Sequence, residues 1–211
     1  MRTDAEAKQQ IVEITHDLFA MGQLTPTGGN VSARSADPEL LWITPSQMYK
    51  GGLDAESLVL IRRDGAIVEG KNRPSIEYQM HWASYAARPD ATAAVHTHAP
   101  AVVAFGLTNQ SFPPINTDAI ALADTRIVPW FMPGSGELAA AVGEAIKASR
   151  GAILQCHGLM AVGETMRKAA NRAIMLEETA RILLYCKQFG GEVTLIPPDW
   201  VEKLGPIKDF I

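Results

Sequence analysis

Short apolar runs typical of buried strands alternate along this chain with longer segments of helical periodicity. The strand-like runs cover residues 40–44, 58–63, 66–69, 93–99, 126–130 and 151–157. Two of them flank Asp64-Gly65, a dipeptide that strongly favours the tight turn of an antiparallel hairpin. This alternation, with its early hairpin, predicts an α/β fold: a three-layer α/β/α arrangement around a central mixed, largely antiparallel sheet.

Four long segments are predicted to be helices. They cover residues 4–21, 75–87, 136–148 and 165–189. The first opens with Thr3-Asp4-Ala5-Glu6, which has the spacing of a capping box. The second places Glu77 in its first turn, where the helix dipole favours a carboxylate whether or not it has a chemical role. His81 lies four residues further on, and it is either support for Glu77 or an ordinary contact on the helix face.

Length and composition restrict the class of protein. A chain of 211 residues is long enough for one hydrophobic core, so we expect a single domain over residues 1–211. A net charge of −4 disfavours a nucleic-acid partner, which would need clustered Lys and Arg. Two cysteines are too few for a disulfide framework, and no signal peptide or membrane-spanning apolar run is present. We therefore expect a cytoplasmic protein without a membrane partner.

The strand-like run 93–99 contains a His-x-His pair. Alternate side chains of a strand point to the same face, so His96 and His98 are predicted to lie close together. Two such imidazoles can bind one transition metal, although one buried structural histidine beside an exposed one would give the same pattern. A third, His157, ends another apolar run, where alternation predicts that Cys156 points into the core. Three histidines and one carboxylate suffice for a catalytic zinc site.

Five short motifs occur in the order found in class II aldolase/adducin-type proteins. They are Gly28-Gly29-Asn30-Val31-Ser32, Ile43-Thr44-Pro45-Ser46, Pro74-Ser75-Ile76-Glu77, Val95-His96-Thr97-His98-Ala99 and Gln155-Cys156-His157-Gly158-Leu159. The paired glycines of the first either let the backbone approach a ligand or form a plain turn. The chain resembles this family over nearly its whole length, and most of all its metal-dependent lyases of the fuculose-phosphate aldolase type. The resemblance implies the class II aldolase-like form of the predicted fold.

The resemblance also implies roles for individual residues. It makes His96, His98 and His157 metal ligands, and makes Glu77 both a ligand and the catalytic acid/base. The positions that match substrate-binding residues are Gly29, Asn30, Ser46, Gln47 and Ser75. The expected cofactor is Zn²⁺, with Mn²⁺, Co²⁺ or Fe²⁺ as alternatives for the same ligands. The family further implies a small-molecule substrate and a homotetramer with active sites at subunit interfaces.

The expected reaction is metal-dependent cleavage of a carbon–carbon bond. A ketose or ketose phosphate would undergo retro-aldol cleavage through a metal-stabilised enediolate, while Glu77 takes one proton and returns another. No lysine Schiff base is needed. Because the three histidines must be neutral to bind the metal, binding is expected to weaken below about pH 6.5.

Three positions depart from the sugar-phosphate aldolases of the family. Gln47 replaces a frequent glycine, and its side chain either crowds a phosphate or offers an amide to a carboxylate. Ile76 replaces a serine hydroxyl, and no tyrosine is evident as proton donor, which leaves Asp118 or a neighbouring subunit for that role. A decarboxylase of a keto or hydroxy acid and a sugar-phosphate 4-epimerase therefore remain alternatives. The complete ligand set disfavours a non-catalytic, adducin-like interaction domain.

Overall fold

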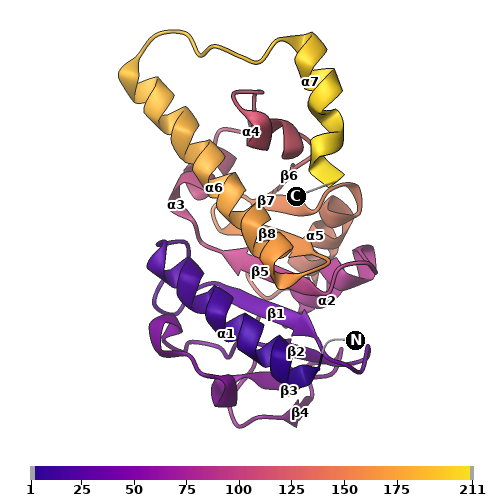
Figure 1. Cartoon of the computed structure of the whole chain (residues 1–211). Helices are drawn as coiled ribbons and strands as arrows, with labels where there is room; N and C mark the ends of the chain where they lie inside the picture. Colours follow the sequence, from indigo (N-terminus) through magenta and orange to yellow (C-terminus); the bar gives the residue numbers. More distant parts are fainter. Residues whose placement is uncertain (1–2, 210–211) are drawn as a thin grey trace.

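The computed structural model describes residues 3–209, and its strands form one mixed sheet (Figure 1). The strands are β1 Asn30–Arg34, β2 Leu41–Ile43, β3 Val59–Ile61, β4 Ile67–Glu69, β5 Ala93–Thr97, β6 Arg126–Val128, β7 Gly151–Leu154 and β8 Gly158–Gly163. Their order across the sheet is β4-β3-β2-β1-β5-β8-β7-β6. Every neighbouring pair is antiparallel except β6 and β7, which are parallel. The sheet is therefore mixed and largely antiparallel, as the sequence predicts.

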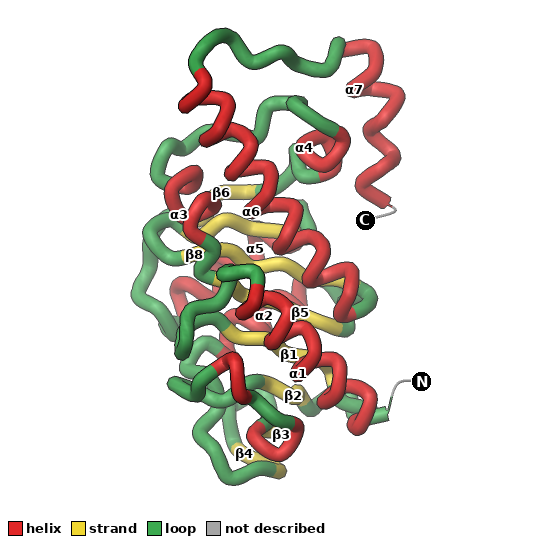
Figure 2. The backbone as a smooth tube through the Cα atoms, turned by 60° about the vertical axis from the view of Figure 1, so that its left-hand side comes forward, coloured by secondary structure: helices red, strands yellow, loops and turns green. Residues whose placement is uncertain are grey.

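Helices cover both faces of the sheet. The α-helices are α1 Asp4–Ala20, α2 Tyr78–Ala87, α3 Pro100–Gly106, α4 Thr117–Ala121, α5 Gly136–Ala148, α6 Met166–Phe189 and α7 Pro198–Leu204. Three short 3₁₀ helices are η1 Lys50–Gly52, η2 Ala55–Ser57 and η3 Gly205–Asp209. Figure 2 shows α1 and α6 crossing the same face, while α2 and α5 pack together on the other. None of the helices within residues 3–209 is long and apolar enough to cross a lipid bilayer.

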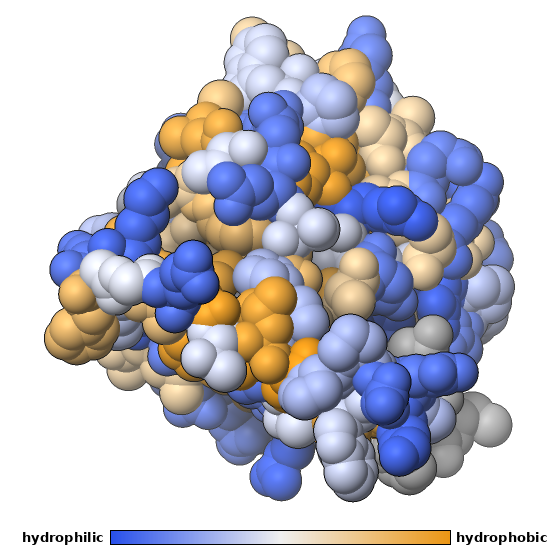
Figure 3. Space-filling view, turned by 90° about the horizontal axis from the view of Figure 1, so that it is seen from above, coloured by the Kyte–Doolittle hydropathy of each residue, from blue (hydrophilic) through white to orange (hydrophobic). Residues whose placement is uncertain are grey.

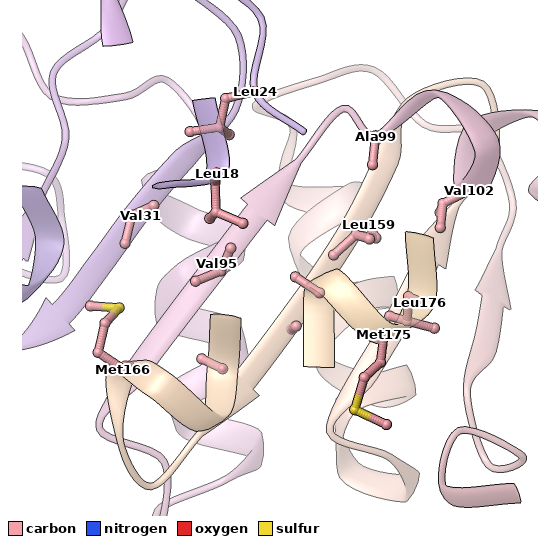
Figure 4. Packing of buried hydrophobic residues seen from close by; sticks show 14 of the residues in the cluster. Leu18, Leu24, Val31, Val95, Ala99, Val102, Leu159, Met166, Met175 and Leu176 are labelled. Carbon is pink, nitrogen blue, oxygen red and sulfur yellow. The ribbon is translucent and has the colours of Figure 1, made fainter. Parts of the chain in front are cut away.

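Each face of the sheet has its own hydrophobic core. On the α1/α6 face, Leu18 and Leu176 pack on Val31, Val95 and Leu159 (Figure 4). On the other face, buried side chains of α2 and α5 pack on Ala94 of β5 and on Met160 and Val162 of β8, which alternate with the residues of the first core. Burial of both sheet faces explains why the strands read as continuous apolar runs. The three-layer α/β/α fold is confirmed.

Several local predictions are confirmed by hydrogen bonds. The Thr3 hydroxyl accepts from the Glu6 backbone N–H, and the Glu6 carboxylate accepts from the Thr3 N–H, which completes the capping box of α1. The Asp64-Gly65 turn joins β3 and β4, and the Gly65 N–H donates to the Arg62 carbonyl. Structures of this kind can be predicted because they depend only on a few residues that are close together in the sequence.

Two local predictions are wrong. Helix α2 begins at Tyr78 and not at Ser75, because the Ser75 N–H donates to the Thr44 carbonyl and Pro74 bridges to Pro45. The predicted strand 151–157 ends at Leu154, and residues 155–157 form a tight turn into β8. Cys156 therefore has a left-handed backbone, with φ of 57°, and an exposed side chain in place of the predicted core position.

The stability of the α1/α6 side depends on a buried carboxylate that caps α3. Glu177 of α6 is fully buried, and its carboxylate accepts from the backbone N–H groups of Ala101 and Val102. It replaces a conventional cap, because Ala99 at the N-cap position of α3 offers no side-chain acceptor. We expect Glu177→Ala to lower the free energy of unfolding by about 2–3 kcal/mol, measured by urea denaturation.

The neighbouring Glu178 provides a matched control. It pairs with Arg181 at 3.0 Å, as Glu177 does at 3.1 Å, but its side chain is 50% exposed. Glu178→Ala should change the free energy of unfolding by no more than about 0.5 kcal/mol. Equal losses in the two variants would contradict the capping role of Glu177.

Candidate metal centre

Four side chains that are distant in sequence meet at one end of the central strands. His96 lies in β5 and His98 just beyond it, while His157 belongs to the turn between β7 and β8. Glu77 occupies the position immediately before α2. Because Asn30 of β1 pairs with His96 of β5, the cluster lies where the two middle strands of the sheet adjoin, on the α2 face.

The potential ligand atoms of these residues form a compact group. One atom from each of Glu77, His96, His98 and His157 lies within 4.8 Å of all the others. Nε2 of His96 is 3.0 Å from Nε2 of His98 and 3.2 Å from Oε2 of Glu77. Nε2 of His157 is 3.1 Å from Oε1 of Glu77. The structure thus brings together all four predicted ligands.

The protonation pattern of the cluster fits a bound cation. Nδ1 of His96 lies 2.8 Å from the Leu159 carbonyl, which only accepts hydrogen bonds, so Nδ1 carries the proton of the neutral ring and Nε2 is bare. Oε1 of Glu77 is buried and faces Nε2 of His157 at 3.1 Å. The lone pair of His96 Nε2 and the carboxylate oxygen Oε2 of Glu77 therefore face each other at 3.2 Å without a proton between them, an arrangement that a metal ion stabilises. The donor set of three imidazoles and one carboxylate suits a divalent transition metal.

Burial and mutual charge shift the titration of the cluster. Burial raises the pKa of Glu77, but the charge of a protonated His96 and the hydrogen bonds that protonated His157 and His96 donate outweigh it, leaving that pKa well below its usual range. Burial lowers the pKa of His98 to about 3, helped by the charges of His96 and His157. Burial also lowers the pKa of His96, but the Glu77 charge and hydrogen bond prevail, so that pKa is raised. Glu77 is therefore the anion of the site, and His96 is more basic than His98.

The raised pKa of His96 predicts the pH dependence of metal binding. A proton on His96 competes with the metal, and its raised pKa means that the competition already operates above about pH 6.5. We expect the affinity for a divalent ion to decline on acidification from near neutral pH, earlier than unperturbed histidines would predict. A chelator-competition titration from about pH 5.5 to about pH 8.5 measures the profile. An affinity that stays constant down to about pH 6.5 would contradict it.

The cluster opens into a cavity of about 300 Å³. All five predicted substrate-binding residues line it, namely Gly29, Asn30, Ser46, Gln47 and Ser75. A Cβ atom on Gly28 would lie 2.6 Å from Nδ1 of His98, and Gly29 has φ of +78°, so the paired glycines let this loop lie against the histidines. Gln47 also has a left-handed backbone, with φ of 55°. The cavity therefore has His98 and His157 on one side and loop backbone on the other.

Three further residues either depart from the sequence prediction or add to it. Asp118 lies in the first turn of α4 and does not line this cavity, so its role as proton donor stays a prediction. Pro133, which follows β6, does line the cavity, although nothing in the local sequence distinguishes it from an ordinary turn residue. The Asn30 amide donates to Oε2 of Glu77 at 2.8 Å. Asn30 therefore contacts a predicted ligand as well as the cavity.

The fold and the cluster together define the class of protein. It is a three-layer α/β/α protein that carries one carboxylate and three imidazoles placed to hold a divalent metal. A family model described as class II aldolase and adducin N-terminal domain matches residues 9–184, and the chain belongs to this family. Its resemblance to the family, inferred from five short motifs, is confirmed.

Individual relatives are similar over most of their length. A 5-deoxy-D-ribulose 1-phosphate aldolase of Bacillus thuringiensis is 31% identical over 198 residues, which cover 93% of this chain and 92% of the relative. The L-fuculose phosphate aldolase of Escherichia coli is 35% identical over 178 residues, covering 83% and 81%. The structure of YgbL from Klebsiella pneumoniae, described as an aldolase/epimerase/decarboxylase, has a TM-score of 0.87 and 27% identity and covers 97% of this chain and 100% of its own.

Proposed function

We propose that this protein is a divalent-metal-dependent aldolase that cleaves a carbon–carbon bond of a ketose phosphate. The observation that carries the proposal is the convergence of Glu77 and three histidines at a cavity lined by backbone loops. The named activities of the two aldolase relatives support the same reaction class. A single domain over residues 1–211, in which these four residues act as ligands, is part of the proposal.

The chain's own residues have distinct tasks in this reaction. His96, His98, His157 and Glu77 would hold a divalent ion, which would supply Lewis acidity toward a carbonyl and its neighbouring hydroxyl. Glu77, ionised because its pKa is depressed, accepts a proton from substrate at a carboxylate oxygen and returns it later. Zn²⁺ is the proposed ion, and Mn²⁺, Co²⁺ and Fe²⁺ suit the same ligands.

The surroundings of the cavity favour an anionic substrate. Lys50 is almost fully buried, and its ammonium contacts the Pro45 carbonyl at 3.4 Å with no carboxylate within ion-pair distance in the described part of the chain. Burial lowers the pKa of Lys50 to about 8, so it is largely protonated at neutral pH. Through this contact its charge lies next to the loop that continues into Ser46 and Gln47. An uncompensated cation behind loop backbone stabilises a phosphate or carboxylate bound there.

Decarboxylation is the second candidate. Two cavity residues favour it: Gln47 presents a side-chain amide, and Ile76 presents an exposed apolar side chain where a hydroxyl would bind phosphate. The alternatives named for YgbL, including decarboxylase and epimerase, agree with a site that serves several outcomes after carbon–carbon cleavage. A sugar-phosphate 4-epimerase uses the same cleavage followed by re-addition.

The proposal includes a cytoplasmic homotetramer with active sites at subunit interfaces. Exposed apolar side chains support association: Ile76 lies at the cavity, and Trp130 and Met132 lie within three residues of the cavity residue Pro133. The end of the molecule where α6 ends and α7 lies exposes Phe189 and Trp200, and Figure 3, which views this end, shows hydrophobic side chains among hydrophilic ones. Apolar patches on a protein surface commonly mark contacts with other chains. Sedimentation velocity measures the assembly state.

A substrate panel tests the reaction. Protein loaded with each divalent ion would be assayed against ketose 1-phosphates, free ketoses, and keto and hydroxy acids with and without phosphate. Aldehyde release from a ketose phosphate supports the aldolase, whereas carbon dioxide release from an acid without aldehyde release would replace it by the decarboxylase. Protein that binds the metal tightly but turns over none of these compounds would count against both the aldolase and the decarboxylase.

A further inference from the structure

A chain of buried polar side chains lies behind the carboxylate of Glu77. It runs from Glu77 through Asn30, His81 and Ser32 to Tyr85. Asn30 and Ser32 share one face of β1, because they are two residues apart on a strand. His81 and Tyr85 share one face of α2, because they are four residues apart on a helix. The network therefore joins the sheet to the helix directly beneath the metal site.

The direction of every hydrogen bond follows from the carboxylate. Ionised Glu77 only accepts, so Nδ2 of Asn30 must face it, at 2.8 Å, and Oδ1 of Asn30 must face His81. Nε2 of His81 then carries the ring proton and donates it to that oxygen. Nδ1 of His81 is bare and accepts from the Ser32 hydroxyl at 2.6 Å. Ser32 in turn accepts from the Tyr85 hydroxyl at 2.9 Å.

His81 is held neutral in this network. It is fully buried, and burial lowers its pKa to about 3, with the charge of His96 adding to the effect and that of Glu77 opposing it. A neutral imidazole with a fixed tautomer is a rigid donor on one side and a rigid acceptor on the other. It has no proton to exchange with substrate near neutral pH, so its influence on the site passes through Asn30.

We propose that His81, backed by Ser32 and Tyr85, is a positioning residue that fixes the Asn30 amide and thereby aims the Glu77 carboxylate at the three histidines. If the amide turned over, its oxygen would face the carboxylate, and two acceptors would repel each other. Glu77 would then lose the donor on Oε2, the same oxygen that lies 3.2 Å from Nε2 of His96. Partners behind a metal ligand orient it in this way and tune its basicity. The inference concerns how Glu77 is placed and rests on the proposed function only for its effect on turnover.

Nuclear magnetic resonance of metal-free, ¹⁵N-histidine-labelled protein tests the network directly. We expect His81, assigned by the signal lost in His81→Gln, to be protonated at Nε2, and His96 at Nδ1. In Ser32→Ala, which removes the donor to Nδ1, the His81 signal should shift toward a mixture of tautomers. An Nδ1-protonated His81 in the unmodified protein would overturn the assignment.

Kinetics and metal binding test the consequence. We expect His81→Phe to lower kcat and the affinity for Co²⁺ by about 10- to 100-fold, and to alter the visible absorption of bound Co²⁺. His81→Gln, which keeps a donor toward Asn30, should recover part of both. Ser84→Ala is the matched control, because it removes another buried α2 side chain whose hydroxyl donates only to the Met80 carbonyl.

The outcomes separate this inference from the proposed function. If His81→Phe stays within about twofold of Ser84→Ala in kcat and Co²⁺ affinity, the positioning role is wrong although the aldolase stands. If no substrate is turned over but His81→Phe still weakens Co²⁺ binding, the function fails and the positioning role stands. Should His81→Phe not fold, Tyr85→Phe tests the same network, and an unchanged Co²⁺ spectrum together with an unchanged His81 tautomer would contradict it.

Discussion

Replacing His96 by alanine is expected to abolish metal binding and turnover together. His96 is the central ligand: its Nε2 lies 3.0 Å from Nε2 of His98 and 3.2 Å from Oε2 of Glu77, and its side chain is fully buried. Without it, two histidines and one carboxylate remain around an enlarged space. We expect metal content, measured by inductively coupled plasma mass spectrometry, to fall from about one ion per chain to less than about a tenth. We expect kcat to fall by at least about 10³-fold.

Two further variants separate this effect from a loss of folding. His98→Ala removes a ligand that lies beyond the end of β5, so its effect on the sheet should be smaller while metal is still lost. His16→Ala removes a histidine of α1 outside the cluster and should leave metal content unchanged. Folded His96→Ala and His98→Ala proteins that both retain one tightly bound ion would contradict the assignment of the site.

The features of the fold that sequence could predict are those set by local rules. Alternation along residues 93–99 correctly placed His96 beside His98, because the two-residue period of a strand extends far enough to include both. The capping box at Thr3 and the Asp64-Gly65 hairpin were predictable for the same reason. The sequence could not predict which face of the sheet each strand residue points to. Strands that helices cover on both sides lack the apolar/polar alternation that distinguishes one face from the other.

The features that sequence missed depend on contacts between distant segments. Glu77 lies before α2 and not within it, because Pro74 and Ser75 pair with the loop at Thr44 and Pro45, about thirty residues earlier in the chain. His81 was predictable as a neighbour of Glu77 on one helix face, but its actual partner is Asn30, which packing of α2 on β1 brings to it. Residue types thus identify the ligands, while their supporting hydrogen bonds require the tertiary structure.

Replacing Glu77 by glutamine should separate metal binding from proton transfer. Gln keeps the size and one neutral oxygen ligand, and three histidines remain, so we expect most of the metal to stay bound. It removes the ionised base, so kcat should fall by about 10²- to 10⁴-fold with a much smaller change in KM. Steady-state kinetics on the metal-loaded variant, with metal content determined on the same sample, measures both effects.

The same substitution should also change the pH dependence of metal binding. It should extend binding to lower pH, whereas the loss of a ligand alone would only weaken binding. The charge of Glu77 is what raises the pKa of His96 against its burial. In Glu77→Gln that pKa should fall, so protons compete less, and the metal affinity should persist to lower pH than in the unmodified protein. Glu137→Gln is the control, because Glu137 is an exposed carboxylate in the first turn of α5. If Glu77 served only the helix dipole, both variants would show small stability changes and full turnover, and this result would exclude Glu77 from the chemistry.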